Sequence, residues 1–514
     1  MTNNVGLILR KRAWLSPGLE GLVDTGTGKR YTFDELNRRS NRTANFVREL
    51  GVKPGDRVAL LLMNGVEFIE SFFALAKIGV VVVPLNWRLV ADELAFILKD
   101  SGAGVLIYGG EFAEVAGALQ SRGPDATAIA EWIQVGGEGI PGFARSYGAL
   151  HQSAPETEPG IGAEEEDLLY IMYTSGTTGL PKGAMHTHNS AIWTCISSGP
   201  TIDQRYRDRY LMSLPLFHVG ALTPLTTCVY CGITAVVLRS FDPVRTWELI
   251  ESERISIMLA VPSMLNFMLQ VPDHASCNYS SLRWIMSGAA PVPVAFIEAY
   301  AKIGIEIHQI YGLTECCGPA CLTSPEDALR KAGSTGKAFF HTDVRVVDAQ
   351  GNDTAPDVPG EVIIRCKHLM KGYWNRPEAT ADTIRDGWLY TGDVATVDDE
   401  GFVYIQDRTK DMIISGGENV YPAEIENVIL RHPKVKEVAV IGQPSAKWGE
   451  SPLAIVVRND DTLTGSEILD HCKGKLAPFK LPKTVQFIDV IPRNPTGKVL
   501  KRVLREQYSG PGPE

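Results

Sequence analysis

The residues best suited to chemistry form one short segment rich in glycine and hydroxyl side chains. An apolar run, Leu168 to Tyr173, precedes the sequence TSGTTGLPKG, which begins at Thr174 and includes Lys182. Glycines let backbone N–H groups point inward, hydroxyls add donors, and a lysine adds positive charge, which together can hold phosphate oxygens. The standard P-loop pattern, G-x-x-x-x-G-K-[ST], is absent. The segment therefore predicts a phosphate-binding loop of another type, with a plain surface turn as the alternative.

Other motifs accompany this loop further along the chain. They are YGLTE at 311–315, YTGD at 390–393, DRTKDMIISGGEN at 407–419 and PRNPTGK at 492–498. With the glycine-rich loop, and in this order, they resemble the signatures of the acyl-adenylate-forming superfamily, which includes acyl-CoA synthetases, luciferases and peptide-synthetase adenylation domains. The resemblance covers residues 5–508. Within the superfamily the chain resembles bacterial fatty-acyl-CoA synthetases overall.

The resemblance implies an enzyme that works in two half-reactions. A carboxylic acid attacks the α-phosphorus of ATP to form an acyl adenylate, and the thiol of coenzyme A then displaces AMP. Because two anions meet in the first step, positive charge near the α-phosphate is the main catalytic requirement. The resemblance places Lys498 there and implies that Thr174 and Glu315 hold Mg²⁺ through hard oxygen ligands. Arg408 completes the expected catalytic set as a ribose contact.

The same resemblance implies the remaining nucleotide contacts. Asp393 is expected to accept the ribose hydroxyls, and Tyr311 to face adenine, although a core tyrosine would look identical in sequence. The full set of expected ATP and AMP contacts is Thr174, Ser175, Gly176, Thr177, Thr178, Gly179, Lys182, Gly288, Ala289, Ala290, Tyr311, Gly312, Thr314, Glu315, Asp393, Arg408 and Lys498. The expected coenzyme A tunnel is Ser415, Gly416, Gly417 and Glu418, reached when the small domain rotates about Lys410.

The acid is expected to bind beside two segments with small residues, 217–221 and 287–291. The expected acyl contacts are His218, Val219, Gly220, Gly288, Ala289 and Leu313. Amino-acid-activating relatives place an aspartate near the first segment, and none lies between Leu214 and Thr227. This apolar character favours a medium- or long-chain fatty acid. An aryl or alicyclic acid stays open, because feruloyl-CoA and related ligases share the same motifs.

The elements that must position these residues follow from the hydrophobic pattern. A capping box at Thr32 and Glu35 begins a helix, and apolar strands at 58–62, 80–84 and 105–108 alternate with further helices. Strands apolar on both faces indicate mainly parallel sheets covered by helices. After residue 406 a smaller alternation predicts a separate α+β unit. The expected class is α/β and α+β, with an N-terminal ATP- and acyl-binding domain at 1–407, a hinge at 408–411, a mobile C-terminal lid domain at 412–508 and a flexible tail at 509–514.

Composition narrows the function classes. Apolar residues make up 44% and charged residues 21% of the chain, as in ordinary globular proteins. The net charge of -10 argues against nucleic acid as a partner, since phosphates require clustered cations. Nine cysteines without a framework predict reduced thiols in the cytoplasm, and the C-x-x-C of Cys228 and Cys231 is interpreted as buried small residues. No secretory signal is expected at 1–9.

Two segments raise the question of a membrane. Residues 219–238 carry no charge, but Pro224 and Gly232 favour a core helix followed by a strand. A local cluster, Arg205, Arg207 and Arg209, is either a hydrated loop or a surface that meets an anionic membrane, with cytoplasmic localisation in both cases. The oligomeric state stays open. A non-catalytic nucleotide-binding protein and a luciferase-type oxidase are the other classes, and the presence of Lys498 favours catalysis.

Overall fold

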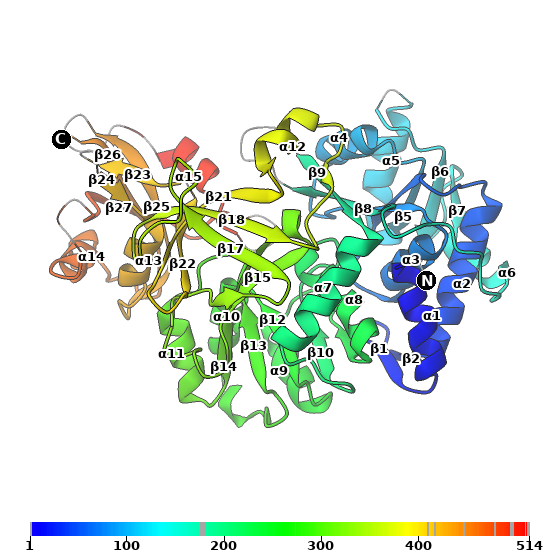
Figure 1. Ribbon diagram of the computed structural model, residues 1–514, viewed down its shortest axis with the longest axis horizontal. Helices are drawn as coiled ribbons and strands as arrows, with labels where there is room; N and C mark the ends of the chain where they lie inside the picture. Colours follow the sequence, from blue (N-terminus) through cyan, green and yellow to red (C-terminus); the bar gives the residue numbers. More distant parts are fainter. Residues whose placement is uncertain are drawn as a thin grey trace.

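The computed structural model describes residues 3–124, 126–174, 181–272, 274–408, 411–415, 418–445, 448–476, 478, 480–493, 498–508 and 510, and of residues 275, 407, 408, 418 and 419 it describes the backbone alone. Figure 1 shows a large unit that contains the N-terminus and a smaller one, orange to red, at the other end. The helices of the large unit are α1 (Val5–Leu15), α2 (Phe33–Glu49), α3 (Val66–Lys77), α4 (Ala91–Ser101), α5 (Ala113–Ser121), α6 (Tyr147–Ser153), α7 (His188–Thr201), α8 (Val219–Cys231), α9 (Pro243–Ser252), α10 (Pro262–Leu269), α11 (Val294–Lys302) and α12 (Pro377–Thr383).

The first large sheet positions the glycine-rich loop. Its order is β19-β9-β8-β4-β3-β5-β6-β7. The strands are β3 (Arg57–Leu61), β4 (Val81–Pro84), β5 (Val105–Gly109), β6 (Glu131–Val135), β7 (Ala144–Ser146), β8 (Leu168–Thr174), β9 (Lys182–Thr187) and β19 (Gly372–Tyr373). From β8 through β7 the neighbours are parallel, whereas β9 returns antiparallel to β8. The predicted loop therefore follows the carboxyl end of β8, where ligands bind in such sheets.

A second sheet carries the other expected nucleotide motifs. Its order is β16-β15-β14-β13-β12-β10-β11-β1-β2. The strands are β1 (Glu20–Asp24), β2 (Lys29–Thr32), β10 (Arg209–Met212), β11 (Thr234–Val237), β12 (Ile257–Ala260), β13 (Trp284–Ser287), β14 (Glu306–Leu313), β15 (Gly318–Leu322) and β16 (Lys337–Ala338). Its interior is parallel from β1 to β14, and β2, β15 and β16 are antiparallel additions. Mainly parallel sheets are thus confirmed for these two layers.

A third sheet adds antiparallel strands to a large unit whose sheets are mainly parallel, as predicted. It is antiparallel throughout, in the order β17-β18-β21-β20 with β22 on β21. The strands are β17 (Thr342–Val347), β18 (Gly360–Cys366), β20 (Ile384–Arg385), β21 (Trp388–Val397) and β22 (Val403–Arg408). Short connections explain the difference, because parallel strands need a long crossover and no helix separates β17 from β18 or β21 from β22. Asp393 lies on this sheet.

The small unit has the predicted α+β character. Its sheet has the order β24-β23-β26-β25, with β27 parallel to β26. The elements are β23 (Ile413–Ser415), β24 (Glu418–Val420), α13 (Pro422–Ile429), β25 (Val435–Ser445), β26 (Gly449–Arg458), α14 (Gly465–Cys472), β27 (Thr484–Phe487) and α15 (Lys501–Tyr508). Helix α14 ends at Cys472, where Lys473 adopts an extended conformation ahead of Gly474, which has a positive φ of 73°.

Two local predictions are also confirmed. The Thr32 side chain accepts from Glu35 N, and the Glu35 carboxylate accepts from Thr32 N, which is the capping box that begins α2. The uncharged segment at 219–238 forms α8, Gly232 and β11. Among the described residues no helix is both long and apolar enough to cross a bilayer.

The approach to β8 is fixed by a segment without helix or strand, residues 154–163, called here the strap. Asn41 on α2 donates to Glu156 O at 2.9 Å, and Lys77 on α3 donates to the Glu158 carboxylate at 2.6 Å. Gly162 packs so closely on α3 that an added Cβ would lie 1.9 Å from Ile78 O. The position of β8, and of the loop that follows it, is therefore fixed by backbone contact between the strap and the end of α3.

We predict that Gly162→Ala destabilises the fold. The methyl group cannot fit against Ile78 O without moving the strap or α3, and such overpacking costs about 1–3 kcal/mol of unfolding free energy. Urea titration measures the loss. Gly142→Ala is the matched control because no atom lies within 4 Å of its added Cβ, and its change should stay within about 0.5 kcal/mol. Equal stability of the two variants would contradict the close packing of the strap.

Candidate functional site

The end of the β8–β9 hairpin brings together the first predicted residues. Thr174 ends β8 and is the cross-strand partner of Lys182, which begins β9. The Thr174 hydroxyl donates to Lys182 O at 3.4 Å. The Lys182 ammonium lies 5.2 Å from the centre of the Tyr373 ring. The predicted loop residues Ser175, Gly176, Thr177, Thr178 and Gly179 lie outside the described residues.

Glu315 lies in a short 3-10 turn, Thr314–Cys316, directly after β14. The Tyr373 hydroxyl donates to Glu315 Oε1 at 2.8 Å, and no described residue donates to Oε2. Met370 N donates to Glu315 O at 2.8 Å. The carboxylate is therefore held by one oxygen and offers the other. Tyr373 also touches Lys182, so it joins this turn to the end of the hairpin.

Two buried histidines hold the turn on either side of Glu315. His186 Nε2 lies 2.7 Å from Thr314 O, and His368 Nδ1 lies 2.7 Å from Cys316 O. Burial lowers the pKa of both imidazoles to about 4, so each is neutral near pH 7 and carries a single N–H. Because a carbonyl only accepts, the proton lies on Nε2 of His186 and on Nδ1 of His368.

The expected ribose contacts lie on the third sheet. Asp393 is buried and accepts a hydrogen bond from the Tyr311 hydroxyl at 2.7 Å. Desolvation, reinforced by the Asp393 charge, raises the pKa of Tyr311 well above its usual value. Arg408 is the cross-strand partner of Asp393, and only its backbone is described. The structure thus joins Tyr311 and Asp393, and the hydroxyl of Tyr311 orients the carboxylate that was expected at the ribose.

Glycines allow close backbone approach at two predicted positions. A Cβ on Gly288 would lie 2.2 Å from Ile310 O, and one on Gly312 would lie 1.9 Å from Gly318 O. Ala289 has a positive φ of 67°, which turns the chain sharply between Gly288 and Ala290 after β13. The segments after β13 and along β14 are therefore packed without intervening side chains. Tyr311 and Leu313, on either side of Gly312, are both partly buried.

The expected acyl segment begins α8. His218 precedes its first turn, which contains Val219 and Gly220. His218 Nε2 is buried without a hydrogen-bond partner among the described residues, and burial lowers the pKa of His218 to about 3. One turn further, Thr223 donates to Cys317 O at 2.8 Å, so α8 is tied directly to the turn that carries Glu315.

The predicted residues of the small unit are described only in part. Ser415 ends β23 and is buried, and the backbone of Glu418 begins β24. Gly416, Gly417 and the predicted hinge residue Lys410 lie outside the described residues. Lys498 is partly buried and lies just before α15.

Comparison with known proteins gives the family. The sequence pattern of the AMP-binding enzyme family matches residues 9–374, and that of the AMP-binding enzyme C-terminal domain matches residues 424–498. The chain belongs to the AMP-binding enzyme family. The first of these matches spans β8, β9 and β14, the strands at whose ends the predicted nucleotide motifs lie.

Three relatives illustrate the range of this AMP-binding enzyme family. The long-chain-fatty-acid–CoA ligase FadD13 of Mycobacterium tuberculosis is 48% identical, over 99% of this chain and 100% of its own length. The feruloyl-CoA synthase of an Amycolatopsis species is 40% identical, over 97% of this chain and 98% of its own. The solved structure of the anthranilate CoA ligase AuaEII with anthranoyl-AMP is 28% identical and superposes with a TM-score of 0.93, covering 99% and 97% of the two chains.

Sequence reasoning missed the residues that hold the Glu315 turn in this AMP-binding enzyme. Tyr373, His186 and His368 lie in no motif that carries chemistry by its spacing, and His186 is 128 positions away from the carbonyl it binds. The usable signal was the two-residue period of a strand, which places His186 on the same face as Lys182 if 182–187 is a strand.

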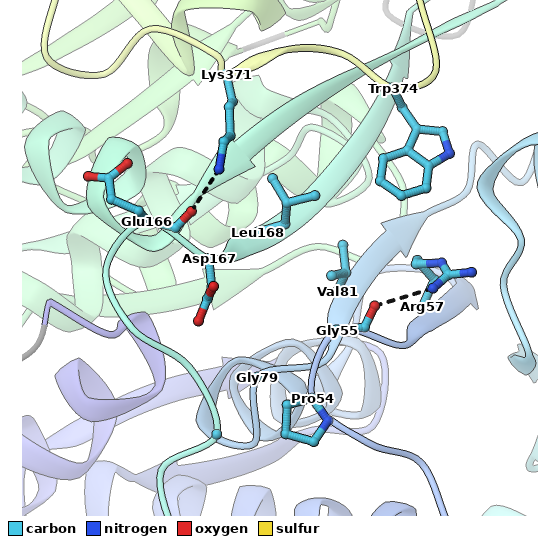
Figure 2. A pocket seen from close by; sticks show the side chains of 11 residues that line it. Pro54, Gly55, Arg57, Gly79, Val81, Glu166, Asp167, Leu168, Lys371 and Trp374 are labelled. Atoms are coloured by element: carbon cyan, nitrogen blue, oxygen red, sulfur yellow. Dashed lines mark hydrogen bonds between the residues drawn. The ribbon is translucent and has the colours of Figure 1, made fainter.

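A cavity of about 300 Å³ lies away from these residues. It is lined at the amino ends of β3, β4 and β8 and, as Figure 2 shows, by Lys371 and Trp374. Lys371 donates to Glu166 O at 3.3 Å, and Arg57 donates to the carbonyls of Gly55, Ser101 and Gly102. Both cations bind backbone carbonyls, and none of the predicted site residues lines this cavity.

The structure changes the interpretation of Arg205, Arg207 and Arg209 as one basic surface. Arg205 pairs with Asp203 at 2.6 Å, and Arg209 pairs with Glu20 at 2.7 Å and with Glu253. Arg209 has a side chain only 23% exposed, so it supports β10 instead of facing solvent. The exposed Arg207 rests beside the Tyr206 ring at 5.5 Å. The three arginines therefore do not form one basic patch, because neighbouring carboxylates compensate two of them.

Proposed function

We propose that this AMP-binding enzyme is an ATP-dependent acyl-CoA synthetase that converts a medium- or long-chain fatty acid into its coenzyme A thioester. The observation that carries the proposal is the meeting of Thr174, Lys182 and Glu315 at the end of β8, where phosphate chemistry is expected. Full-length similarity to a long-chain-fatty-acid–CoA ligase supports the same reaction class.

In the first half-reaction the acid and the α-phosphate of ATP are both anionic, so the protein must neutralise and align them. Lys182 places a positive charge at the hairpin end, where it meets phosphate oxygens. Asp393, oriented by Tyr311, accepts the ribose hydroxyls and fixes the nucleotide. Lys498 approaches the carboxylate and α-phosphate. The acid oxygen then bonds to phosphorus, and pyrophosphate leaves with the electron pair of the broken P–O bond.

The donors at the turn fit Mg²⁺. A divalent magnesium ion prefers hard oxygen ligands, and Glu315 Oε2 and the Thr174 hydroxyl oxygen are of that kind. Tyr373 leaves Oε2 of Glu315 without a donor from any described residue, as a ligand oxygen requires. When bound there, Mg²⁺ would neutralise phosphate charge. Glu315 and Thr174 are the residues that would hold it.

In the second half-reaction the thiol of coenzyme A attacks the acyl carbonyl and AMP leaves. The small unit rotates about Lys410 so that Lys498 withdraws and the chain from Ser415 to Glu418 lines the pantetheine arm. Gly416 and Gly417 let backbone approach that narrow arm. The small unit has its own core around β25 and β26, which allows it to move as a body.

The acyl chain lies beside α8. A cavity of only about 10 Å³ adjoins Thr223 and Cys317 in this structure, lined also by Tyr170, Ala191, Leu222 and Thr226. A long acyl chain needs more space than this cavity provides. The 40% identity to a feruloyl-CoA synthase makes an aryl acid the second candidate substrate.

We also propose a peripheral membrane contact, through a surface that keeps only Arg207 of the three arginines. Trp14, at the end of α1, is 71% exposed, and Tyr206 is 52% exposed. Lys11 lies over the Trp14 ring at 3.9 Å, and Arg207 lies beside Tyr206. Exposed aromatic rings with basic neighbours suit a membrane interface. This surface, defined by Lys11, Trp14, Tyr206 and Arg207, replaces the three-arginine patch.

Lys498→Ala is expected to separate the half-reactions. Removing one preorganised charge-stabilising donor should slow adenylation by about 10²–10³-fold, measured as acid-dependent exchange of pyrophosphate into ATP. Thioester formation from presynthesised acyl-AMP should persist. Lys473→Ala, which alters an exposed lysine of the same unit, is the control. Equal losses in both half-reactions would contradict the role assigned to Lys498.

The substrate is tested by coenzyme A-dependent AMP release across straight-chain, aromatic and alicyclic acids. We expect kcat/KM to rise with chain length, because each buried methylene contributes about 0.8 kcal/mol of binding. A maximum at an aromatic or cyclic acid would overturn the fatty-acid assignment and keep the ligase chemistry. Absence of AMP formation with every acid would overturn the ligase itself.

The membrane contact is tested by cosedimentation with vesicles containing phosphatidylserine. Arg207→Ser should weaken binding about fivefold, as expected for one basic side chain near an anionic surface. Arg365→Ser, an exposed arginine on the third sheet, should leave binding unchanged. Trp14→Ser should weaken binding to neutral vesicles as well, because its contribution is apolar. Equal effects of Arg207→Ser and Arg365→Ser would refute the proposed surface.

A further inference from the structure

The turn that carries Glu315 is held at every residue by a side chain from elsewhere in the chain. The contacts are His186 Nε2 to Thr314 O at 2.7 Å, Tyr373 to Glu315 Oε1 at 2.8 Å, His368 Nδ1 to Cys316 O at 2.7 Å and Tyr170 to Cys317 Sγ at 3.1 Å. A surface turn would satisfy its carbonyls with water. This turn instead has little conformational freedom left.

The pairing of strands β8, β9 and β19 places three of these side chains, Tyr170, His186 and Tyr373. Lys182 and His186 share one face of β9, because they are four residues apart in a strand. Tyr170 is the cross-strand partner of His186 on β8, and their rings lie 5.0 Å apart. Tyr373 pairs with Ala184 from the other side, between Lys182 and His186. One sheet face therefore presents the predicted phosphate lysine together with Tyr170, His186 and Tyr373, whereas His368 comes from the segment between β18 and β19.

We propose that Tyr373, His186 and His368 are positioning residues for adenylation, which fix Glu315 so that its free oxygen faces the phosphates. The inference rests on the proposed function. Tyr373 sets the carboxylate directly by occupying Oε1. His186 and His368 act through the backbone, by holding the carbonyls on either side of Glu315.

The physical reason is that a carboxylate binds a metal ion most strongly when one of its oxygens points at the ion. Residues that hydrogen-bond a metal ligand typically contribute about 10–100-fold to metal affinity or activity. Without Tyr373, Glu315 could rotate about its side-chain torsions and offer either oxygen in several directions. The ring of Tyr373 also supports Lys182 at 5.2 Å, so Tyr373→Phe removes the hydroxyl alone and keeps that contact.

The first test measures nucleotide binding without turnover. Isothermal titration without acid gives the Kd of Mg·ATP and the Kd of ATP in EDTA. For Tyr373→Phe we expect the Kd of Mg·ATP to rise about tenfold. The Kd of metal-free ATP should change by less than about twofold, because the hydrogen bond that is removed is the one to Glu315. A merely structural role would shift both constants together and overturn the proposal.

Tyr300→Phe is the matched control. Its buried hydroxyl donates to Leu265 O at 2.9 Å between α11 and α10, on the second sheet. We expect a similar change in melting temperature and no change in either Kd. If Tyr373→Phe binds Mg·ATP as tightly as Tyr300→Phe, the assignment of Tyr373 is wrong.

The second test uses the two histidine tautomers. A glutamine amide can replace an Nε2–H donor, whereas an asparagine amide can replace an Nδ1–H donor. We therefore expect His186→Gln and His368→Asn to retain adenylation within about threefold, and the exchanged pair, His186→Asn and His368→Gln, to lose about tenfold or more. Pyrophosphate exchange at saturating acid gives the rates. Equal rates for Asn and Gln at each position would overturn the backbone role of the histidines.

Wild-type protein separates failure of this inference from failure of the proposed function. If the wild type forms no acyl-AMP and binds ATP equally with and without Mg²⁺, the ligase assignment fails and the inference fails with it. If the wild type is active and prefers Mg·ATP, but Tyr373→Phe matches it, the ligase assignment stands and the positioning role alone is refuted.

Discussion

The site depends on one constraint, which is the set of hydrogen bonds that attach the Thr314–Cys316 turn to one face of the first sheet. The Thr314–Cys316 turn ends β14 of the second sheet, yet it is held by His186 on β9 of the first sheet and by Tyr373 on β19. The hydrogen bonds lie in a buried region of low dielectric, where an unpaired carbonyl is costly. The relative position of the two sheets is therefore fixed at the point where the nucleotide motifs meet.

The same junction links the residues expected to bind the two substrates. Thr223 ties α8, the expected acyl helix, to Cys317, and the third sheet contributes Asp393 through its contact with Tyr311. A displacement of the turn would therefore move the acyl helix, the expected ribose acceptor and the expected metal ligand together.

The sequence predicted most of the features that depend on residues close together in the chain. The capping box of α2, the course of α8 and the parallel strands follow from periodicity and termini signals. The antiparallel third sheet escaped prediction because the pairing partners of its strands are not local in sequence. The pairing of Arg209 with Glu20 crosses 189 positions, so a pattern of charges at 205–209 could not reveal that it is compensated. The donors around Glu315 were missed for the same reason, since only folding brings β9, β19 and the turn together.

The central claim is that Glu315 and Thr174 present oxygens to one metal ion on the phosphates, with Tyr373 holding the other oxygen of Glu315. A crystal structure of the protein with Mn²⁺ and ATP tests it most directly, because Mn²⁺ takes oxygen ligands like Mg²⁺ and is located by anomalous scattering. The account predicts an anomalous peak at coordination distance from Glu315 Oε2 and from a phosphate oxygen, with the Tyr373 hydroxyl still on Oε1. A metal bound to the nucleotide but away from Glu315, or a Glu315 carboxylate that has left Tyr373, would contradict it.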